Sequence, residues 1–153
     1  CPFLRGAIVI YDPNDPLKHL YDVDNENTVI TLTDGYHTPA IELTEQYINV
    51  TRSVPIPDTG LINGAGRYLG GPTVPFHIVN VRSGRKYRLR VVNIGCRPFH
   101  SFSVDSQTLT TMRFDIYAGQ KYSAVVSNYF IYRAHLINLI PFQLQANQPV
   151  GNY

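Results

Sequence analysis

The chain has 153 residues, of which 44% are apolar and 16% are charged, and its formal net charge is +2 at pH 7. This composition is typical of a globular protein and excludes a disordered one. No basic run exceeds Arg85-Lys86, which argues against a nucleic-acid partner, and no apolar run is long enough to cross a membrane. Eleven Tyr, eleven Pro and eleven Gly, with β-branched runs such as Thr28 to Thr33, favour an all-β sandwich or barrel.

The first part of the chain contains two expected strands. Gly6 to Tyr11 is a short apolar run that stops at the Asp-Pro-Asn-Asp-Pro sequence of residues 12–16, because proline cannot continue a strand ladder. Thr28 to Thr33 is the second expected strand, and it ends at Asp34-Gly35.

The next part is predicted to connect strands. Ile41 to Tyr47 fits either a short helix or irregular structure. Ser53 to Asp58 contains two prolines and is therefore expected to be a linker or an edge segment, with a domain boundary at this place. Asn63-Gly64 predicts a tight turn, since Asn-Gly supplies the positive φ that such a turn needs.

The clearest strand pattern lies between residues 79 and 96. Strands are expected at Phe76 to Val81 and at Lys86 to Val92. In the second, Tyr87, Leu89 and Val91 alternate with basic residues, which is typical of a half-buried strand. Its apolar side needs a second sheet to cover it, because a lone hairpin is marginal in water.

The remaining expected strands are Ser101 to Val104 and a strand pair within Ile116 to Val126, around Ala118-Gly119-Gln120. No helical period is sustained over three turns, and no internal repeat is found.

No catalytic or metal-binding residue is predicted from the residues themselves. The Gly-rich segments lack the strand and helix that a phosphate-binding loop requires, and Ser103 and Asp105 face away from His100 in an extended strand. The histidines are scattered singly, without the spacing of a metal site. They are His19, His37, His77, His100 and His135.

Two further features have alternative interpretations. Asn49-Val50-Thr51 is a glycosylation sequon that suits a secreted loop, and an unmodified surface Asn is the alternative. An aromatic set fits either the core or a ligand groove, and the core is the simpler interpretation. The set comprises Tyr87, Phe99, Phe102, Phe114, Tyr117 and Tyr122.

Many segments, in order and spacing, resemble fungal laccases. The resemblance covers nearly the whole chain except Ser127 to Gln143. The matching segments are Cys1 to Tyr11 with the following Asp-Pro-Asn-Asp-Pro, Leu20 to Asp24, Thr28 to Leu32, Asp34 with Tyr36-His37, Leu61 to Arg67, Gly84 to Arg88, Ser101 to Asp105, Tyr117 to Ser123 and Ala146 to Pro149.

The resemblance implies a secreted multicopper oxidase built from three cupredoxin-like Greek-key domains. Such enzymes take single electrons from phenols or aromatic amines at a blue copper and reduce oxygen to water at a trinuclear copper cluster. The copper ligands of the family lie in four His-rich motifs, none of which occurs in this chain. We therefore expect a fragment that binds no copper and is inactive alone, with the remaining laccase domains as its partners.

The expected fold is an incomplete cupredoxin-like Greek-key β-sandwich. Residues 1–52 are expected to be the C-terminal part of the first domain and a linker, and residues 53–153 the second, non-copper domain. Residues 127–143 are interpreted as an aberrant insert, either a retained intron or a true insertion. A family segment is expected to be missing between Thr110 and Thr111.

The resemblance also assigns roles to three residues. Many laccases carry an acidic residue that binds the phenol directly after the cysteine that matches Cys96. Here that position in the pocket wall is Arg97, which cannot accept a hydrogen bond. Partners outside this chain are expected for both Cys1 and Cys96, and a Cys1–Cys96 bridge is an open alternative.

Two other functional classes compete with the oxidase. One is a β-sandwich binding or adhesion module without a redox role. The other is a translated fragment without function, because missing strands leave sheet edges and apolar faces uncovered.

Overall fold

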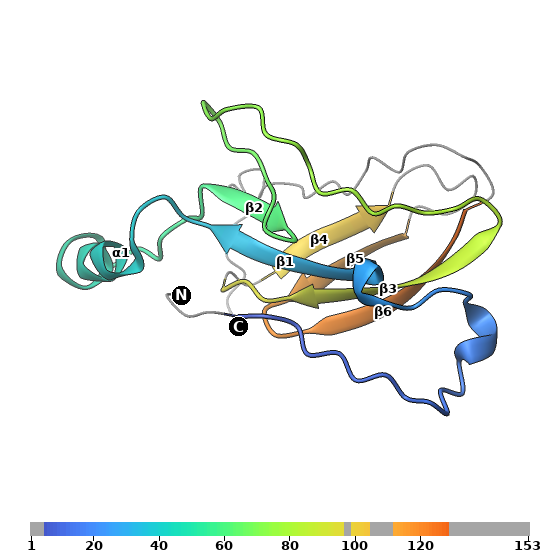
Figure 1. The fold of residues 1–153 in the computed structure, drawn as a ribbon. Coiled ribbons are helices and arrows are strands. Elements are labelled where there is room, and N and C mark those ends of the chain that lie inside the picture. The colour runs from blue at the N-terminus through green and yellow to red at the C-terminus, as the bar shows by residue number, and fades with distance from the viewer. Residues whose placement is uncertain (1–4, 97–98, 105–111, 129–153) are drawn as a thin grey trace.

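The computed structural model describes residues 5–96, 99–104 and 112–128, and strands dominate these residues. Four strands form one sheet in the order β2-β1-β3-β6, and β4 and β5 form a second sheet (Figure 1). The strands are β1 (Val29–Gly35), β2 (Thr59–Ile62), β3 (Arg85–Asn93), β4 (Phe99–Val104), β5 (Met112–Tyr117) and β6 (Lys121–Asn128).

The two sheets share one apolar core, which confirms the predicted β-sandwich. Phe102 of β4 and Ile116 of β5 are fully buried in the same cluster as Ile30, Leu32 and Val91 of the larger sheet. Burying a side chain of this size contributes about 1.5–3 kcal/mol. The core therefore holds the smaller sheet against the larger one.

β3 lies inside the larger sheet and has the predicted alternation. Tyr87, Leu89 and Val91 are buried, whereas the residues between them are partly accessible. β3 pairs in parallel with β1, Val29 opposite Arg90, and antiparallel with β6. It thus has a ladder partner on each side.

The turn after β2 is confirmed. Asn63 and Gly64 have φ of 47° and 79°, the positive values that the Asn-Gly pair predicts. The Asn63 side chain also ties the turn to β1. Its Oδ1 accepts hydrogen bonds from the backbone N–H and the hydroxyl of Thr31 at 2.7 and 3.0 Å, and its Nδ2 donates to the carbonyl of Val29 at 3.1 Å.

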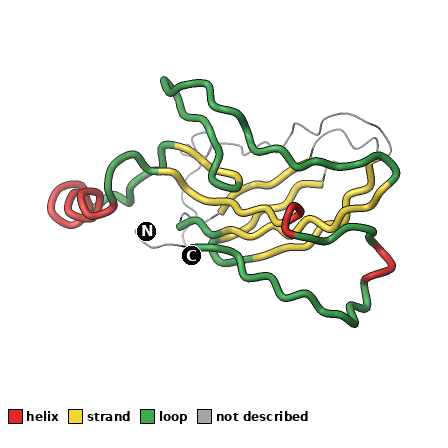
Figure 2. Tube along the Cα trace, viewed as in Figure 1, coloured by secondary structure: helices red, strands yellow, loops and turns green. Residues whose placement is uncertain are grey.

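Two predicted strands are wrong, because Gly6–Tyr11 and Phe76–Val81 are neither strand nor helix. Figure 2 shows the second segment within the long loop that joins β2 to β3. Ile8 is 89% exposed. An apolar run forms a strand only where a neighbouring strand supplies hydrogen-bond partners, and in the described part of the chain neither segment pairs with one.

The two strands expected around Ala118-Gly119-Gln120 are present, but they do not pair with each other. β5 pairs with β4, and β6 pairs with β3, so the turn carries the chain from one sheet to the other. β6 continues to Asn128. Ser127 and Asn128, the first two residues of the predicted insert 127–143, therefore belong to the sheet, opposite Lys86 and Arg85.

The rest of that insert lies outside the described residues. The segment expected to be missing between Thr110 and Thr111 would also fall outside them. Both interpretations stay predictions.

The segment between β1 and β2 contains the helix α1 (Ala40–Gln46), which continues into a π-helical turn, η3 (Tyr47–Thr51). The helical alternative for this segment is therefore right. Residues 53–58 contain no strand or helix, as a linker should. β1 nevertheless pairs with β2 and β3 across residue 52, so the larger sheet is continuous there, and the division at 52/53 stays a prediction about a longer protein.

Candidate functional site

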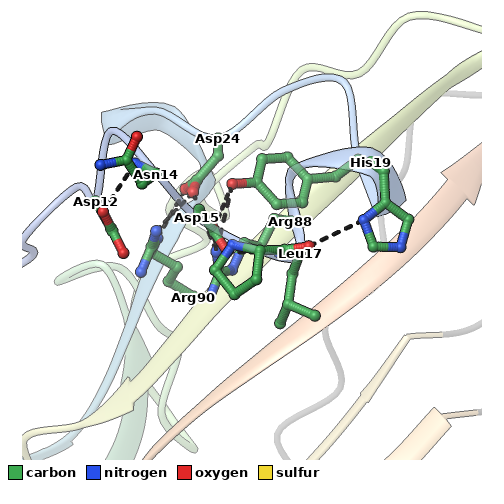
Figure 3. A network of polar contacts seen from close by, with 10 residues as sticks. Asp12, Asn14, Asp15, Leu17, His19, Asp24, Arg88 and Arg90 are labelled. Atoms are coloured by element: carbon green, nitrogen blue, oxygen red, sulfur yellow. Dashed lines mark hydrogen bonds and ion pairs between the residues drawn. The ribbon is translucent and has the colours of Figure 1, made fainter.

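A group of charged side chains joins the segment 12–28 to β3, and we call it the clasp (Figure 3). The alternation of β3 puts Arg88 and Arg90 on the side away from the core, where the acidic segment crosses the strand. Arg90 Nε and Nη2 donate to Asp24 Oδ1 and Oδ2 at 2.7 and 2.6 Å. Arg88 donates to Asp15, and the Tyr21 hydroxyl also donates to Asp15. The clasp is made of Asp15, Tyr21, Asp24, Arg88 and Arg90.

The electrostatics of the clasp stabilise its charged form. The hydrogen bond from the Tyr21 hydroxyl is the main cause that lowers the pKa of Asp15, and the Leu17 N–H and Arg88 add to it. The same bond raises the pKa of Tyr21. The pKa of Arg90 is raised by its bonds to Asp24, whose side chain is only 4% exposed. Because each charge has a partner, the clasp acts as a structural connection.

A second polar cluster surrounds Cys96, beside the predicted pocket wall. Asp34 Oδ2 accepts the Cys96 N–H at 2.6 Å, and the side chain of Asp34 is 2% exposed. His100 Nε2 lies 3.3 Å from Asp34 Oδ1. Asn93 Oδ1 accepts the Gly95 N–H at 2.8 Å, and its Nδ2 donates to the Ile116 carbonyl. The end of β1, the end of β3 and the start of β4 are thereby fixed to one another.

Cys96 is disulfide-bonded in the structure. The chain contains two cysteines, and the other one, Cys1, lies outside the described residues. Arg5, four residues after Cys1, donates to the carbonyls of Ile94 and Gly95 at 3.2 and 3.1 Å. Four residues of extended chain reach about 14 Å. The chain length between Arg5 and Cys1 therefore allows Cys1 to reach Cys96, and we carry a Cys1–Cys96 bridge forward as a proposal.

The other predicted site residues are Arg97 and Asn49. Arg97 lies outside the described residues, so its place in a pocket wall stays a prediction. Asn49 is exposed in η3, beyond the end of α1. Its modification also stays a prediction.

The described histidines contact different partners in different places. His19 Nδ1 lies 3.0 Å from the Pro16 carbonyl, and His77 Nε2 lies 2.8 Å from Asn63 Nδ2. His37 bonds Asp58, and its backbone N–H is the main cause that lowers the pKa of that carboxyl. His100 faces Asp34, and His135 lies outside the described part.

No copper centre fits the side chains that the structure describes. Among residues 5–96, 99–104 and 112–128, no group of three or more His, Cys, Asp or Glu side chains could hold a metal ion. Copper in electron-transfer sites requires imidazole and thiolate ligands, and the sulfur of Cys96 is in a disulfide. We derive no copper-dependent step from these residues.

The aromatic set divides between the core and the surface. Tyr87 and Phe102 are buried, and the ring of Phe114 packs 5.4 Å from that of Phe102. Tyr117 and Tyr122 are about half exposed, at 51% and 43%. The core interpretation is therefore right for Tyr87, Phe102 and Phe114.

Sequence reasoning missed the clasp and the pairing of His100 with Asp34. The clasp had a signal, because an acidic segment precedes a strand whose polar side is basic. The pairing of His100 with Asp34 had none, since residues 66 positions apart carry no local pattern that joins them.

Comparisons with known proteins give consistent results. The family model described as multicopper oxidase matches residues 26–153. Laccase-1 of Agaricus bisporus is 51% identical over 154 residues, which cover 100% of this chain and 28% of the relative. Laccase-4 of Thanatephorus cucumeris is 45% identical over 166 residues, with 98% and 28% coverage. The chain thus spans about 28% of the length of these curated relatives.

A solved structure has a similar fold. The laccase from Botrytis aclada superposes with a TM-score of 0.53 and 24% identity, over 67% of this chain and 23% of that one. This likeness confirms the predicted cupredoxin-like sandwich, with sheets that do not close. None of the helices in the described part has the length and apolar character to span a bilayer.

Proposed function

The chain belongs to the multicopper oxidase family, and from this premise we propose that it forms part of a laccase-type oxidase. The longer protein would oxidise phenols or aromatic amines and reduce oxygen to water. The observation that carries this proposal is the 51% identity with Laccase-1 of Agaricus bisporus over the whole chain. Copper would supply the electron transfer in that longer protein, with ligands that the described residues do not provide.

The part that we assign to this chain is to build one wall of the substrate pocket and to hold it rigid. Arg97 follows Cys96. The backbone is fixed there by the disulfide and by the N–H groups of Cys96 and Gly95, which donate to Asp34 and Asn93. A guanidinium donates hydrogen bonds and repels cations. The pocket would therefore favour anionic phenols, such as those that carry a carboxylate, over cationic aromatic amines.

We also propose that the protein is secreted. The disulfide at Cys96 supports this proposal, because disulfides persist in oxidising compartments and are rare in the cytosol. The secreted laccases that the sequence resembles agree with it. Phenols, oxygen and the remaining laccase domains are the proposed partners.

A chimeric enzyme tests the proposed function. The segment of Agaricus bisporus Laccase-1 that aligns with this chain would be replaced by residues 1–153, and the product would be secreted from yeast with copper supplied. We expect a blue protein that oxidises a phenol and consumes oxygen. A chimera that is secreted and loaded with copper but has no phenol oxidation above background would overturn the proposal.

Two controls accompany the chimera. A second version without residues 129–143 shows whether the predicted insert hinders folding while β6 stays intact. The 153-residue chain alone is expected to retain no copper by elemental analysis and to oxidise no phenol. Copper near one equivalent per chain, or stoichiometric binding of another ligand without copper, would favour a different function for the chain itself.

A further inference from the structure

A long loop joins β2 to β3, and a single polar contact connects its middle part to the larger sheet (Figure 1). His77 Nε2 lies 2.8 Å from Nδ2 of Asn63, in the turn that follows β2. Among the residues that the structure describes, this is the hydrogen bond that joins residues 74–78 to the sheet and its turns. The contact between His77 and Asn63 is therefore the polar anchor of the segment 74–78.

The contacts of Asn63 with β1 determine which of its side-chain atoms faces His77. The backbone N–H of Thr31 donates and cannot accept, so the Asn63 atom that it meets at 2.7 Å must be the oxygen. The carbonyl of Val29 accepts and cannot donate, so the Asn63 atom that it meets at 3.1 Å must be the NH₂ nitrogen. The Asn63 side chain thus continues the ladder along β1 beyond the end of β2, and it presents a donor to His77.

A donor at Asn63 requires an acceptor at His77. Only the uncharged imidazole has a nitrogen without a proton, so Nε2 must be the acceptor and Nδ1 must carry the proton. When His77 takes up a second proton, two N–H donors face each other and the hydrogen bond is lost. Turning the Asn63 amide over would offer its oxygen to the charged ring. It would also set the NH₂ group against the Thr31 N–H and the oxygen against the Val29 carbonyl.

The charged groups on the elements around His77 do not compensate a positive charge there. On the same loop, the guanidinium of Arg67 lies over the ring of Phe76, the residue before His77, at 4.1 Å from the ring centroid. β2 carries no charged side chain, and the carboxylate of β1, Asp34, lies near the far end of that strand. Arg90 of β3, the strand beyond β1, is paired with a carboxylate of its own. The other titratable side chains of the loop are Tyr68 and Arg82.

We propose that the contact between His77 and Asn63 is a pH-sensitive latch, which holds the loop against the larger sheet while His77 is neutral and releases residues 74–78 when His77 is protonated. Histidine is the side chain that ordinarily changes its charge between about pH 5 and 8. His77 is exposed, so a proton reaches its ring without unfolding of the chain. The proposal does not depend on the oxidase function.

Hydrogen exchange in the 153-residue chain tests the latch. The Thr31 N–H donates to Asn63 Oδ1, and the Asn63 N–H donates to the Thr31 carbonyl at 2.9 Å, so protection of these two amides reports how firmly the turn is held. Protection is measured relative to the intrinsic exchange rate at each pH. Between about pH 7.5 and about pH 5 we expect it to fall about two- to tenfold, the range that one neutral hydrogen bond covers. Equal protection at both pH values would overturn the proposal.

The tautomer of His77 is a second and more direct readout. In NMR spectra of the chain with isotopically labelled histidine, the neutral His77 ring should carry its proton on Nδ1 and accept at Nε2. The variant His77→Gln identifies the His77 signals by their loss. A neutral ring protonated on Nε2 would contradict the latch whatever the exchange rates are.

Three variants separate the latch from other effects of pH. A glutamine oxygen accepts at any pH, so His77→Gln should keep the protection of Thr31 and Asn63 at both pH values, whereas His77→Phe has no acceptor and should show the low protection at both. His37→Gln is the matched control, because His37 is an exposed histidine that bonds Asp58 instead, and it should keep the wild-type fall. A fall in His77→Gln equal to that of the wild type would assign the response to another group and contradict the latch. No measurement involves phenol oxidation, so failure of the latch and failure of the oxidase function are distinguishable.

Discussion

The clasp predicts that Asp24→Asn releases the segment 12–28 from β3. In the wild type, both Asp24 oxygens accept from Arg90, and an asparagine would turn its NH₂ group toward the guanidinium. A hydrogen bond to a charged group contributes about 1.5–3 kcal/mol. Arg90 is 17% exposed and can regain some water. We therefore expect the free energy of opening the segment to fall by ~2–3 kcal/mol, which is at the low end for a broken buried ion pair.

Hydrogen exchange measures this loss where it occurs. The N–H groups of Asp22 and Val23 donate to the Lys86 carbonyl at 2.8 and 3.1 Å, so their exchange reports on opening of the segment. Since a tenfold change corresponds to ~1.4 kcal/mol, their exchange should be about 30- to 150-fold faster in Asp24→Asn. This estimate applies where the segment closes faster than an open amide exchanges.

A matched control is Glu26→Gln, which removes the same charge from an exposed residue of the same segment. It should change the exchange of Asp22 and Val23 by less than about threefold, as is usual for a surface substitution. Exchange in Asp24→Asn that equals the control would refute the reasoning. Equal acceleration throughout β6 would instead show global unfolding, which also contradicts a local role for the clasp.

Three other predictions concern the pocket wall, the pH dependence of the clasp and the disulfide. In the chimera, Arg97→Asp places a hydrogen-bond acceptor for the phenol at this position. It should lower the KM for a neutral phenol about five- to tenfold, or ~1–1.4 kcal/mol, with kcat nearly unchanged. An effect on kcat alone contradicts the assignment. Because the folded pKa of Asp15 is lowered, its stabilisation is complete above the ordinary carboxyl pKa of about 3.9 and is lost as the pH falls through the lower folded value. The protection of residues 15–23 from hydrogen exchange, measured relative to the intrinsic exchange rate at each pH, should therefore fall below about pH 4 in the wild type. Asp15→Asn should show no such step. If Cys1 and Cys96 are bridged, the denatured chain should react with no thiol reagent before reduction and with two equivalents after it, whereas reactive thiols in the monomer before reduction would exclude the bridge.

The sequence predicted those strands whose partners exist in the described part of the chain. Tyr87, Leu89 and Val91 alternate because β3 has one face on the core, and this property is local. Gly6–Tyr11 and Phe76–Val81 are equally apolar, yet neither forms a strand. Strand formation depends on a neighbouring strand, and the sequence does not show which segments will be neighbours.

Less of the candidate site could be predicted. The contacts between Arg90 and Asp24 and between His100 and Asp34 join residues 66 positions apart, and many other charge pairings fit the same sequence. Arg97 came from the family resemblance alone. The turn at Asn63-Gly64 was predictable because its geometry depends on two adjacent residues.

The register of β3 links the stability of the sandwich to the backbone that leads to the proposed pocket wall. A shift by one residue would turn Arg88 and Arg90 toward the core and expose Leu89 and Val91, since side chains alternate along a strand. Burying an unpaired charge costs several kcal/mol, so the clasp opposes this shift in the middle of the strand. At the C-terminal end of β3, Asn93 donates to the Ile116 carbonyl and accepts from the Gly95 N–H, which fixes the backbone just before Cys96. The same register that buries the core therefore also fixes the backbone up to Cys96, the residue that precedes the position we propose for the pocket wall.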